Sequence, residues 1–157
     1  MDRCILKIVN KGKAVISMQF NKGTIKPTDN QYKYLYSKLS NRKKAYAKKL
    51  ASKLNSKATF SFHCMDKVTS NKVVLDKDLL KSIIAGNYSI IELNTTNNHD
   101  RVLLRSNNCN QYNVNGKSVY CNLCIVYQPY KNVIITMYNN DVFDNHVTLD
   151  KKRYKKF

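Results

Sequence analysis

The chain has 157 residues, with 28 Lys and Arg against 10 Asp and Glu, so its formal net charge is +18. This length suits one domain with one core, and a hydrophobic content of 43% argues against a largely disordered basic tail. No apolar stretch approaches the roughly 20 residues needed to cross a bilayer, and no signal segment follows Met1. We therefore expect a soluble, cytoplasmic protein, in a bacterial or a host cell.

The excess of positive charge indicates a nucleic-acid partner. A pI near 9.8 lies in the range in which phosphate binding becomes the first hypothesis. A membrane surface is the other anionic candidate, but a membrane-binding helix carries bulky apolar residues opposite its lysines. Here tyrosines interrupt the apolar stripe, which is typical of a protein core. We expect RNA as the partner and no membrane contact.

The five cysteines predict free thiols. They are Cys4, Cys64, Cys109, Cys121 and Cys124, an odd number without a secretion signal. Cys121 and Cys124 have the spacing of half a zinc site, but no second pair follows, and positions three apart on a strand point to opposite faces. We expect no metal and no cofactor.

The first 58 residues predict a hairpin followed by a long basic helix. Cys4–Val9 and Ala14–Phe20 are β-prone and flank a connection that contains Gly12. Thr28 or Asp29 then caps a helix from Asn30 to about Ser56, because apolar residues recur there at helical spacing. Much of the remaining helix surface is lysine, either a solvated face or a surface for phosphates.

Two shorter helices and a set of strands follow. Phe60–Val68 predicts a short helix, and Asp76–Gly86 predicts one that opens on acidic residues and ends at a glycine. After Gly86 the apolar period becomes two, which predicts strands at Tyr88–Leu93, Arg101–Ser106, Val119–Tyr127 and Val133–Asn139. Asn-rich connections at 94–100 and 107–117 and a turn at 128–131 separate them. The expected fold is one α+β domain with the hairpin and helices packed on an antiparallel sheet of about four strands.

Strand parity places a candidate phosphate grip on the open face of this sheet. Arg101 and Arg105 share one face of their strand, while Val102 and Leu104 share the other. On the last strand we expect Val133, Ile135 and Met137 toward the core. Ile134, Thr136 and Tyr138 then point the other way. Two guanidiniums, a hydroxyl and a phenol suit a phosphate, and the strands carry almost no carboxylates to pair with the arginines.

His63, His99 and His146 are the only histidines, and any of them is able to act as an acid or base near neutral pH. The spacing of Asp141, Asp144 and Asp150 matches no standard hard-metal loop. There is also no Walker loop, dinucleotide fingerprint or Cys–His catalytic signature.

The order of four segments is similar to that of small toxin-type ribonucleases. His63–Val68, Leu79–Gly86, Asp100–Arg105 and Val133–Asn139 occur in an order that resembles the barnase, EndoU, colicin and RelE fold superfamily, in which a His on the early helix often precedes an "RV-x-x-R" strand and a terminal "I-T-x-Y/W" strand. The resemblance covers about residues 60–140. It implies a metal-independent endoribonuclease, toxin-like or phage-encoded, with a possible protein antitoxin or immunity partner. Its implied site consists of His63, Arg101, Arg105, Thr136 and Tyr138, with His146 in reserve.

Two functions remain open from the sequence. The first is an endoribonuclease that uses attack by the 2′-hydroxyl, and the second is a non-catalytic nucleic-acid-binding regulator or inhibitor from a phage or mobile element. The single domain, 1–157, divides into the hairpin and long helix (1–58), a nuclease-like core (59–140) and a basic tail (141–157). In both cases we expect phosphate contacts from Lys44, Lys48, Lys49, Lys151, Lys152 and Arg153.

Overall fold

A computed structural model of the chain describes residues 5–10, 13–21, 32–95 and 99–144. The elements run in the order β1 (Ile5–Asn10), β2 (Lys13–Asn21), β3 (Tyr32–Leu35), a 3-10 turn η1 (Tyr36–Lys38), α1 (Asn41–Ala51), β4 (Thr59–Ser61), α2 (Phe62–Thr69), α3 (Lys77–Ile84), β5 (Tyr88–Thr95), β6 (Arg101–Val114), β7 (Lys117–Gln128) and β8 (Val133–Asp141). No helix among these residues is both long enough and apolar enough to span a membrane.

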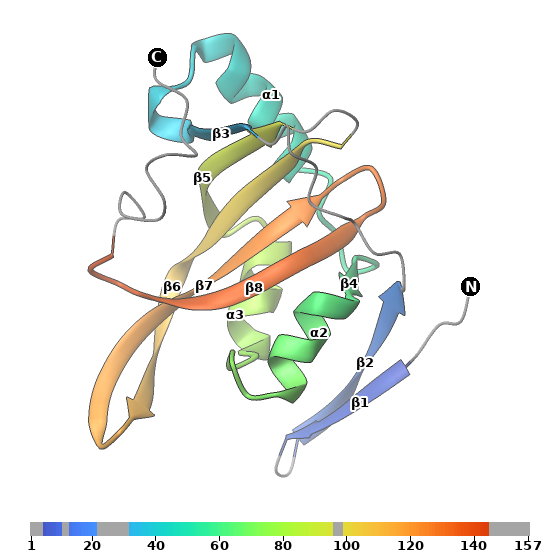
Figure 1. Ribbon diagram of the computed structural model, residues 1–157, viewed down its shortest axis with the longest axis vertical. Helices are drawn as coiled ribbons and strands as arrows, with labels where there is room; N and C mark the ends of the chain where they lie inside the picture. The colour runs from blue at the N-terminus through green and yellow to red at the C-terminus, as the bar shows by residue number, and fades with distance from the viewer. Residues whose placement is uncertain (1–4, 11–12, 22–31, 96–98, 145–157) are drawn as a thin grey trace.

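The strands form one sheet in the order β1-β2-β4-β8-β7-β6-β5-β3 (Figure 1). β4 lies parallel to both β2 and β8, and the other neighbours are antiparallel. The α+β class is therefore confirmed. The sheet is larger than the four strands expected, because β3, β4 and the hairpin β1–β2 extend it at its two sides.

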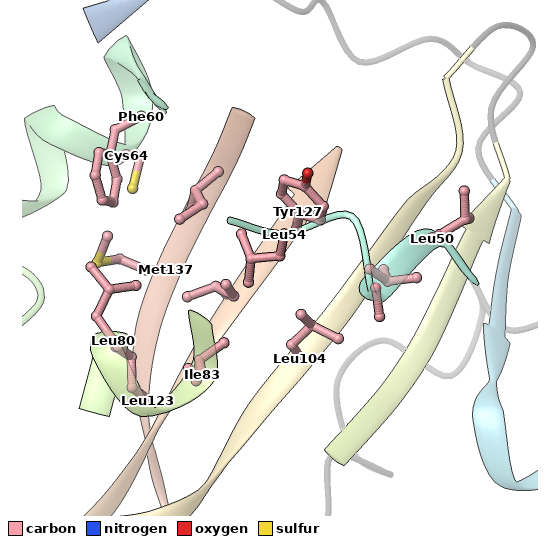
Figure 2. Close-up of a cluster of buried hydrophobic side chains, with 14 of the residues drawn as sticks. Leu50, Leu54, Phe60, Cys64, Leu80, Ile83, Leu104, Leu123, Tyr127 and Met137 are labelled. Atoms are coloured by element: carbon pink, nitrogen blue, oxygen red, sulfur yellow. The ribbon is translucent and has the colours of Figure 1, made fainter. Parts of the chain in front are cut away.

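The three helices pack on one face of the sheet. Alternate residues of the central strands, including Leu104 on β6 and Leu123 on β7, join helix residues in one buried cluster (Figure 2). The helix residues recur at three- and four-residue spacing, as in Leu79, Leu80 and Ile83 of α3. This shared core fixes which face of each strand meets the helices.

The long helix predicted over Asn30–Ser56 is wrong. Among the described residues of this range, Asn41–Ala51 is the only α-helix, and Tyr32–Leu35 is instead the edge strand β3, which pairs with β5. The Ser40 side chain accepts a hydrogen bond from the Lys43 backbone N–H and starts the helix there. The tyrosines at 32, 34 and 36 recur at period two, and this β pattern overrides the helical spacing. The predicted cap at Thr28 or Asp29 lies outside the described residues.

The connection predicted at 107–117 is wrong for a similar reason. β6 runs on to Val114, and β7 starts again at Lys117, so only Asn115 and Gly116 form the turn. Both have positive φ, 51° and 77°, the left-handed conformation that an Asn-Gly hairpin turn needs. The two strands form a ribbon that projects from the sheet (Figure 1).

A β-bulge in β8 corrects the predicted facing of its residues. Thr136 pairs with Val126 and Ile134 pairs with Tyr127, so Ile135 is one extra residue opposite the β7 backbone. The bulge reverses the parity before it. Ile134 therefore packs in the helix-side core, and Val133 lies on the other face, opposite to the expectation.

The start of α3 offers a test of stability. Asp76 caps the helix by accepting from the backbone N–H groups of Asp78 and Leu79, and its second oxygen accepts from Asn110 and Tyr112. Burial raises the pKa of this carboxyl, but these four hydrogen bonds outweigh it and hold the pKa below its usual 3.8.

We predict that Asp76→Ala lowers the free energy of unfolding at pH 7 by about 1–2 kcal/mol, the usual value of such a cap. A lowered folded-state pKa stabilises the protein above the unfolded pKa, and this contribution disappears as the pH falls through the folded pKa. The difference between the two proteins should therefore shrink below about pH 3.8, the unfolded value. Urea unfolding at several pH values measures it, and a pH-independent difference contradicts the assignment.

Candidate functional site

The register places Arg101, Arg105, Thr136 and Tyr138 on the sheet face opposite the helices. Val102 and Leu104 lie in the helix-side core, so Arg101 and Arg105, which flank them, point away from it. Thr136 and Tyr138 pair with Val126 and Cys124 of β7, which point to the same side of the sheet as the two arginines. β7 separates β6, with the two arginines, from β8, with the other two residues.

This face is not open, contrary to the expectation. Leu103, between the two arginines, is 3% exposed, and Cys124 and Gln128 on β7 are 0% exposed. The two arginines, Thr136 and Tyr138 are only partly exposed. A broad RNA-binding surface across the middle of the sheet is therefore not available in this structure.

Arg105 has a structural role. Its Nε and Nη2 donate to Asn122 Oδ1 at 3.0 and 2.8 Å, and its Nη1 donates to the Asp144 backbone carbonyl at 2.8 Å. Nη2 also donates to the carbonyl of Asp141 at 3.0 Å. The guanidinium thus ties the chain after β8 to β7, and these hydrogen bonds compete with any contact to a phosphate.

Arg101 is in a different situation four residues earlier on β6. Its Nε is buried and has no hydrogen-bond partner in the described part of the chain. Burial alone lowers the pKa of this guanidinium, and no carboxylate offsets it. Of the two strand arginines, Arg105 is therefore the one whose guanidinium is engaged by several partners.

Lys67 is a member of the site that the sequence analysis missed. Its Nζ donates to Thr136 Oγ1 at 3.1 Å and lies 5.9 Å from the centre of the Tyr138 ring. His63 is exposed on α2 four residues before Lys67, so the two side chains share one side of that helix. The i, i+4 spacing of His63 and Lys67 was the available sequence signal.

The buried thiols of Cys64 and Cys124 are not activated, and the described residues gather no set of metal ligands. No group of three or more His, Cys, Asp or Glu side chains gathers there. Burial raises the pKa of the Cys64 thiol to about 12, and burial does the same for Cys124, the neighbour of Tyr138. Both thiols are protonated at neutral pH, so neither is an activated nucleophile.

The predicted phosphate-binding lysines of the helix lie on α1. Lys48 and Lys49 are exposed, and Lys44 is half-buried with its Nζ 5.7 Å from the centre of the Tyr36 ring. Lys43 lies in the same way over Tyr34, at 4.9 Å. The other predicted contacts, Lys151, Lys152 and Arg153, and the reserve residue His146 lie outside the described residues.

Comparisons of the chain with protein-family models, with curated proteins and with solved structures gave no match. The resemblance to toxin-type ribonucleases therefore remains a prediction.

We predict that Arg105→Lys destabilises the protein, because lysine cannot reproduce the fork that joins Asn122 to the carbonyls after β8. Hydrogen bonds from a charged group contribute about 1.5–3 kcal/mol, so urea unfolding should show a loss of about that size. An unfolding free energy equal to that of the wild type contradicts the structural role.

Proposed function

We propose that the protein binds nucleic acid, with RNA as the preferred partner, through the basic surface of α1. The observation that carries this proposal is the charge of this part of the chain. Between Asp29 and Asp66 the sequence holds nine cations and no carboxylate: Lys33, Lys38, Arg42, Lys43, Lys44, Lys48, Lys49, Lys53 and Lys57. Within this segment of the sequence, no carboxylate balances the positive charge.

The position of these cations on α1 argues against a purely structural role. Arg42 and Lys43 lie in the first turn, which contains no acidic residue. This is the positive end of the helix dipole, where each cation is unfavourable by about 0.3–1 kcal/mol. An anion at this end is attracted both by the cations and by the free backbone N–H groups of the helix. A phosphate chain supplies such anions.

Two of the cations are held by aromatic rings. Lys43 and Lys44 lie over Tyr34 and Tyr36, and each such contact contributes about 0.5–1 kcal/mol at an exposed site. The rings restrain the ammonium groups without removing their charge. The surface therefore suits phosphate contacts, which position a nucleic acid without reading its sequence.

The test is the salt dependence of binding. Each phosphate contact adds about 0.7 to the slope of log K against log salt for a single strand. Replacing Lys44, Lys48 and Lys49 by Gln should weaken binding of a single-stranded RNA and reduce the slope by about 2. Fluorescence anisotropy at salt concentrations from about 50 to about 200 mM measures both the affinity and the slope.

The matched control replaces three exposed lysines elsewhere, Lys72, Lys81 and Lys117, by Gln. It changes the net charge by the same amount. We expect it to retain most of the affinity and slope. Equal losses in the two triple variants mean that only total charge matters, which rejects α1 as the binding surface.

A second candidate function, the metal-independent ribonuclease, is favoured by the contacts of Lys67 with Thr136 and Tyr138, and by His63 one turn earlier on the same helix. Lys67 supplies next to Thr136 a cation of the kind that stabilises charge on a phosphate during attack by the 2′-hydroxyl. His63 on the same side of α2 would serve as acid or base. Arg105 is not part of this proposed site, because its guanidinium is bonded to Asn122 and to backbone carbonyls. Arg101 is not part of it either, because it lies on β6, two strands away from β8.

If this candidate is correct, the protein cleaves labelled RNA in EDTA and leaves DNA of the same sequence intact, because DNA lacks the 2′-hydroxyl. Losing one transition-state donor costs roughly 10²–10³ in rate, so Lys67→Met should reduce cleavage by about that factor. His63→Ala should do the same. Lys81→Met is the control. If the RNA stays intact, or if both site variants cleave it normally, the ribonuclease candidate is rejected. Nucleic-acid binding without catalysis is then the function that remains.

A further inference from the structure

The turn between β7 and β8 carries an exposed aromatic ring at its tip. Residues 129–132 form this turn, and the Asn132 backbone N–H closes it by donating to the Pro129 carbonyl at 3.1 Å. Tyr130, inside the turn, is 73% exposed and does not belong to the helix-side core. Its ring therefore adds little to the stability of the fold and is accessible to a ligand.

Hydrogen bonds of Asn132 hold the turn against the segment between α1 and β4. Its Oδ1 accepts from the Tyr127 hydroxyl at 2.8 Å, and its Nδ2 donates to Asn55 Oδ1 at 3.3 Å. Its backbone carbonyl accepts from the Thr59 N–H at 3.0 Å. The backbone under Tyr130 is thus ordered before any ligand binds, which lowers the entropic cost of binding there.

Tyr130 is one half of a stacked aromatic pair. Its ring lies on that of His99, with 4.2 Å between the centroids and 20° between the planes. The imidazole covers one face of the phenol ring, and the high exposure of Tyr130 leaves the other face accessible. A nucleobase is a flat ring that stacks on an aromatic side chain whatever its sequence, so it would continue this stack as a third ring.

The surroundings of the stacked pair are basic. Lys131, the next residue of the turn, is exposed, and so are Lys53 and Lys57 in the segment to which the turn is bonded. Asn55 lies between these two lysines, donating to the Lys53 carbonyl and accepting from the Lys57 N–H. The sequence of α1 and β4, of the segment between them, and of β7, the turn and β8 as far as Asn140 contains no Asp or Glu. The phosphates next to a stacked base would therefore meet cations.

The stacked pair is also linked to the basic surface of α1. His99 is followed by Asp100, which accepts from the Tyr46 hydroxyl of α1 at 2.6 Å. Arg42 and Lys49 stand four residues before and three residues after Tyr46, so they share its side of the helix, and both are exposed. The carboxylate nearest in sequence to the stacked pair is thus engaged with α1, and cations flank the contact.

We propose that Tyr130, supported by His99, is a stacking platform for one unpaired base of a single-stranded nucleic acid. Lys53, Lys57 and Lys131 bind the phosphates on either side of that base. This inference rests on the proposed nucleic-acid function and specifies its partner as a single strand, because the bases of a duplex stack on one another and offer no free face. Stacking of this kind reads no sequence.

The first experiment compares two single-stranded RNA oligomers of about ten nucleotides, one with bases and one with abasic sugars, by fluorescence anisotropy. They carry the same phosphate charge. Tyr130→Ala should weaken binding of the base-bearing oligomer about tenfold and leave binding of the abasic oligomer unchanged. The matched control is Tyr120→Ala, since Tyr120 is 51% exposed on β7, and it should keep both affinities. Wild-type affinity of folded Tyr130→Ala for the base-bearing oligomer overturns the platform.

A second experiment detects the stacking directly. The chain contains no tryptophan, so Tyr130→Trp places a single indole fluorophore at the platform. A base stacked on the indole quenches its fluorescence. We expect quenching by the base-bearing oligomer and not by the abasic one, and no quenching by either in the control Tyr120→Trp. An equal response of Tyr130→Trp to the two oligomers contradicts the proposal.

These measurements separate the platform from the proposed function of α1. The triple variant of Lys44, Lys48 and Lys49 removes phosphate contacts, so it should weaken binding of both oligomers, whereas Tyr130→Ala affects only the one with bases. A base-dependent loss in Tyr130→Ala supports the platform even if the triple variant behaves like its lysine control. If the wild type binds neither oligomer, the nucleic-acid function is wrong and the platform is rejected with it.

Discussion

The register of β6, β7 and β8 is the constraint on which the rest of the structure depends. On the helix side, Leu104, Ile125 and Met137 are fully buried against the helices, and a shift by one residue would expose all three. Because side chains alternate, the same register determines what stands on the other face. It points Arg101 and Arg105 away from the helices and places Thr136 and Tyr138 at the edge that Lys67 reaches. The candidate ribonuclease site is thus a consequence of how the core packs.

Much of this arrangement was predictable from local sequence patterns. Asp76 before an amphipathic run and Gly86 after it predicted α3, and Gly86 has the positive φ of 96° that such a helix end uses. The alternation in Arg101–Arg105 placed both arginines on one face. The Asn115-Gly116 turn was also readable, but the Asn-rich sequence around it favoured a loop, and the strand pairing overrode that local preference.

Other features depend on contacts between distant segments, and the sequence alone does not determine them. The bulge at Ile135 arises where β8 must satisfy β7 on one side and β4 on the other, and its backbone carbonyl accepts from the Ser61 hydroxyl. The role of Arg105 depends on carbonyl groups 36 to 39 residues away. Tyr32–Leu35 becomes a strand because β5 offers an edge to pair with, although its spacing also fits a helix. In each case a tertiary partner decides between locally acceptable alternatives.

The basic helix α1 is joined to the start of β6 through one hydrogen bond. The Tyr46 hydroxyl on α1 donates to Asp100, and Asp100 immediately precedes Arg101 at the start of β6. Burial, this hydrogen bond and the Asp100 charge together raise the pKa of Tyr46 to about 12, so the phenol stays protonated and the link persists at neutral pH. The link also occupies the carboxylate of Asp100, the residue immediately before Arg101. By holding Asp100 toward α1, Tyr46 fixes the basic helix against the start of β6, while Arg101, the next residue, points to the other face of the sheet.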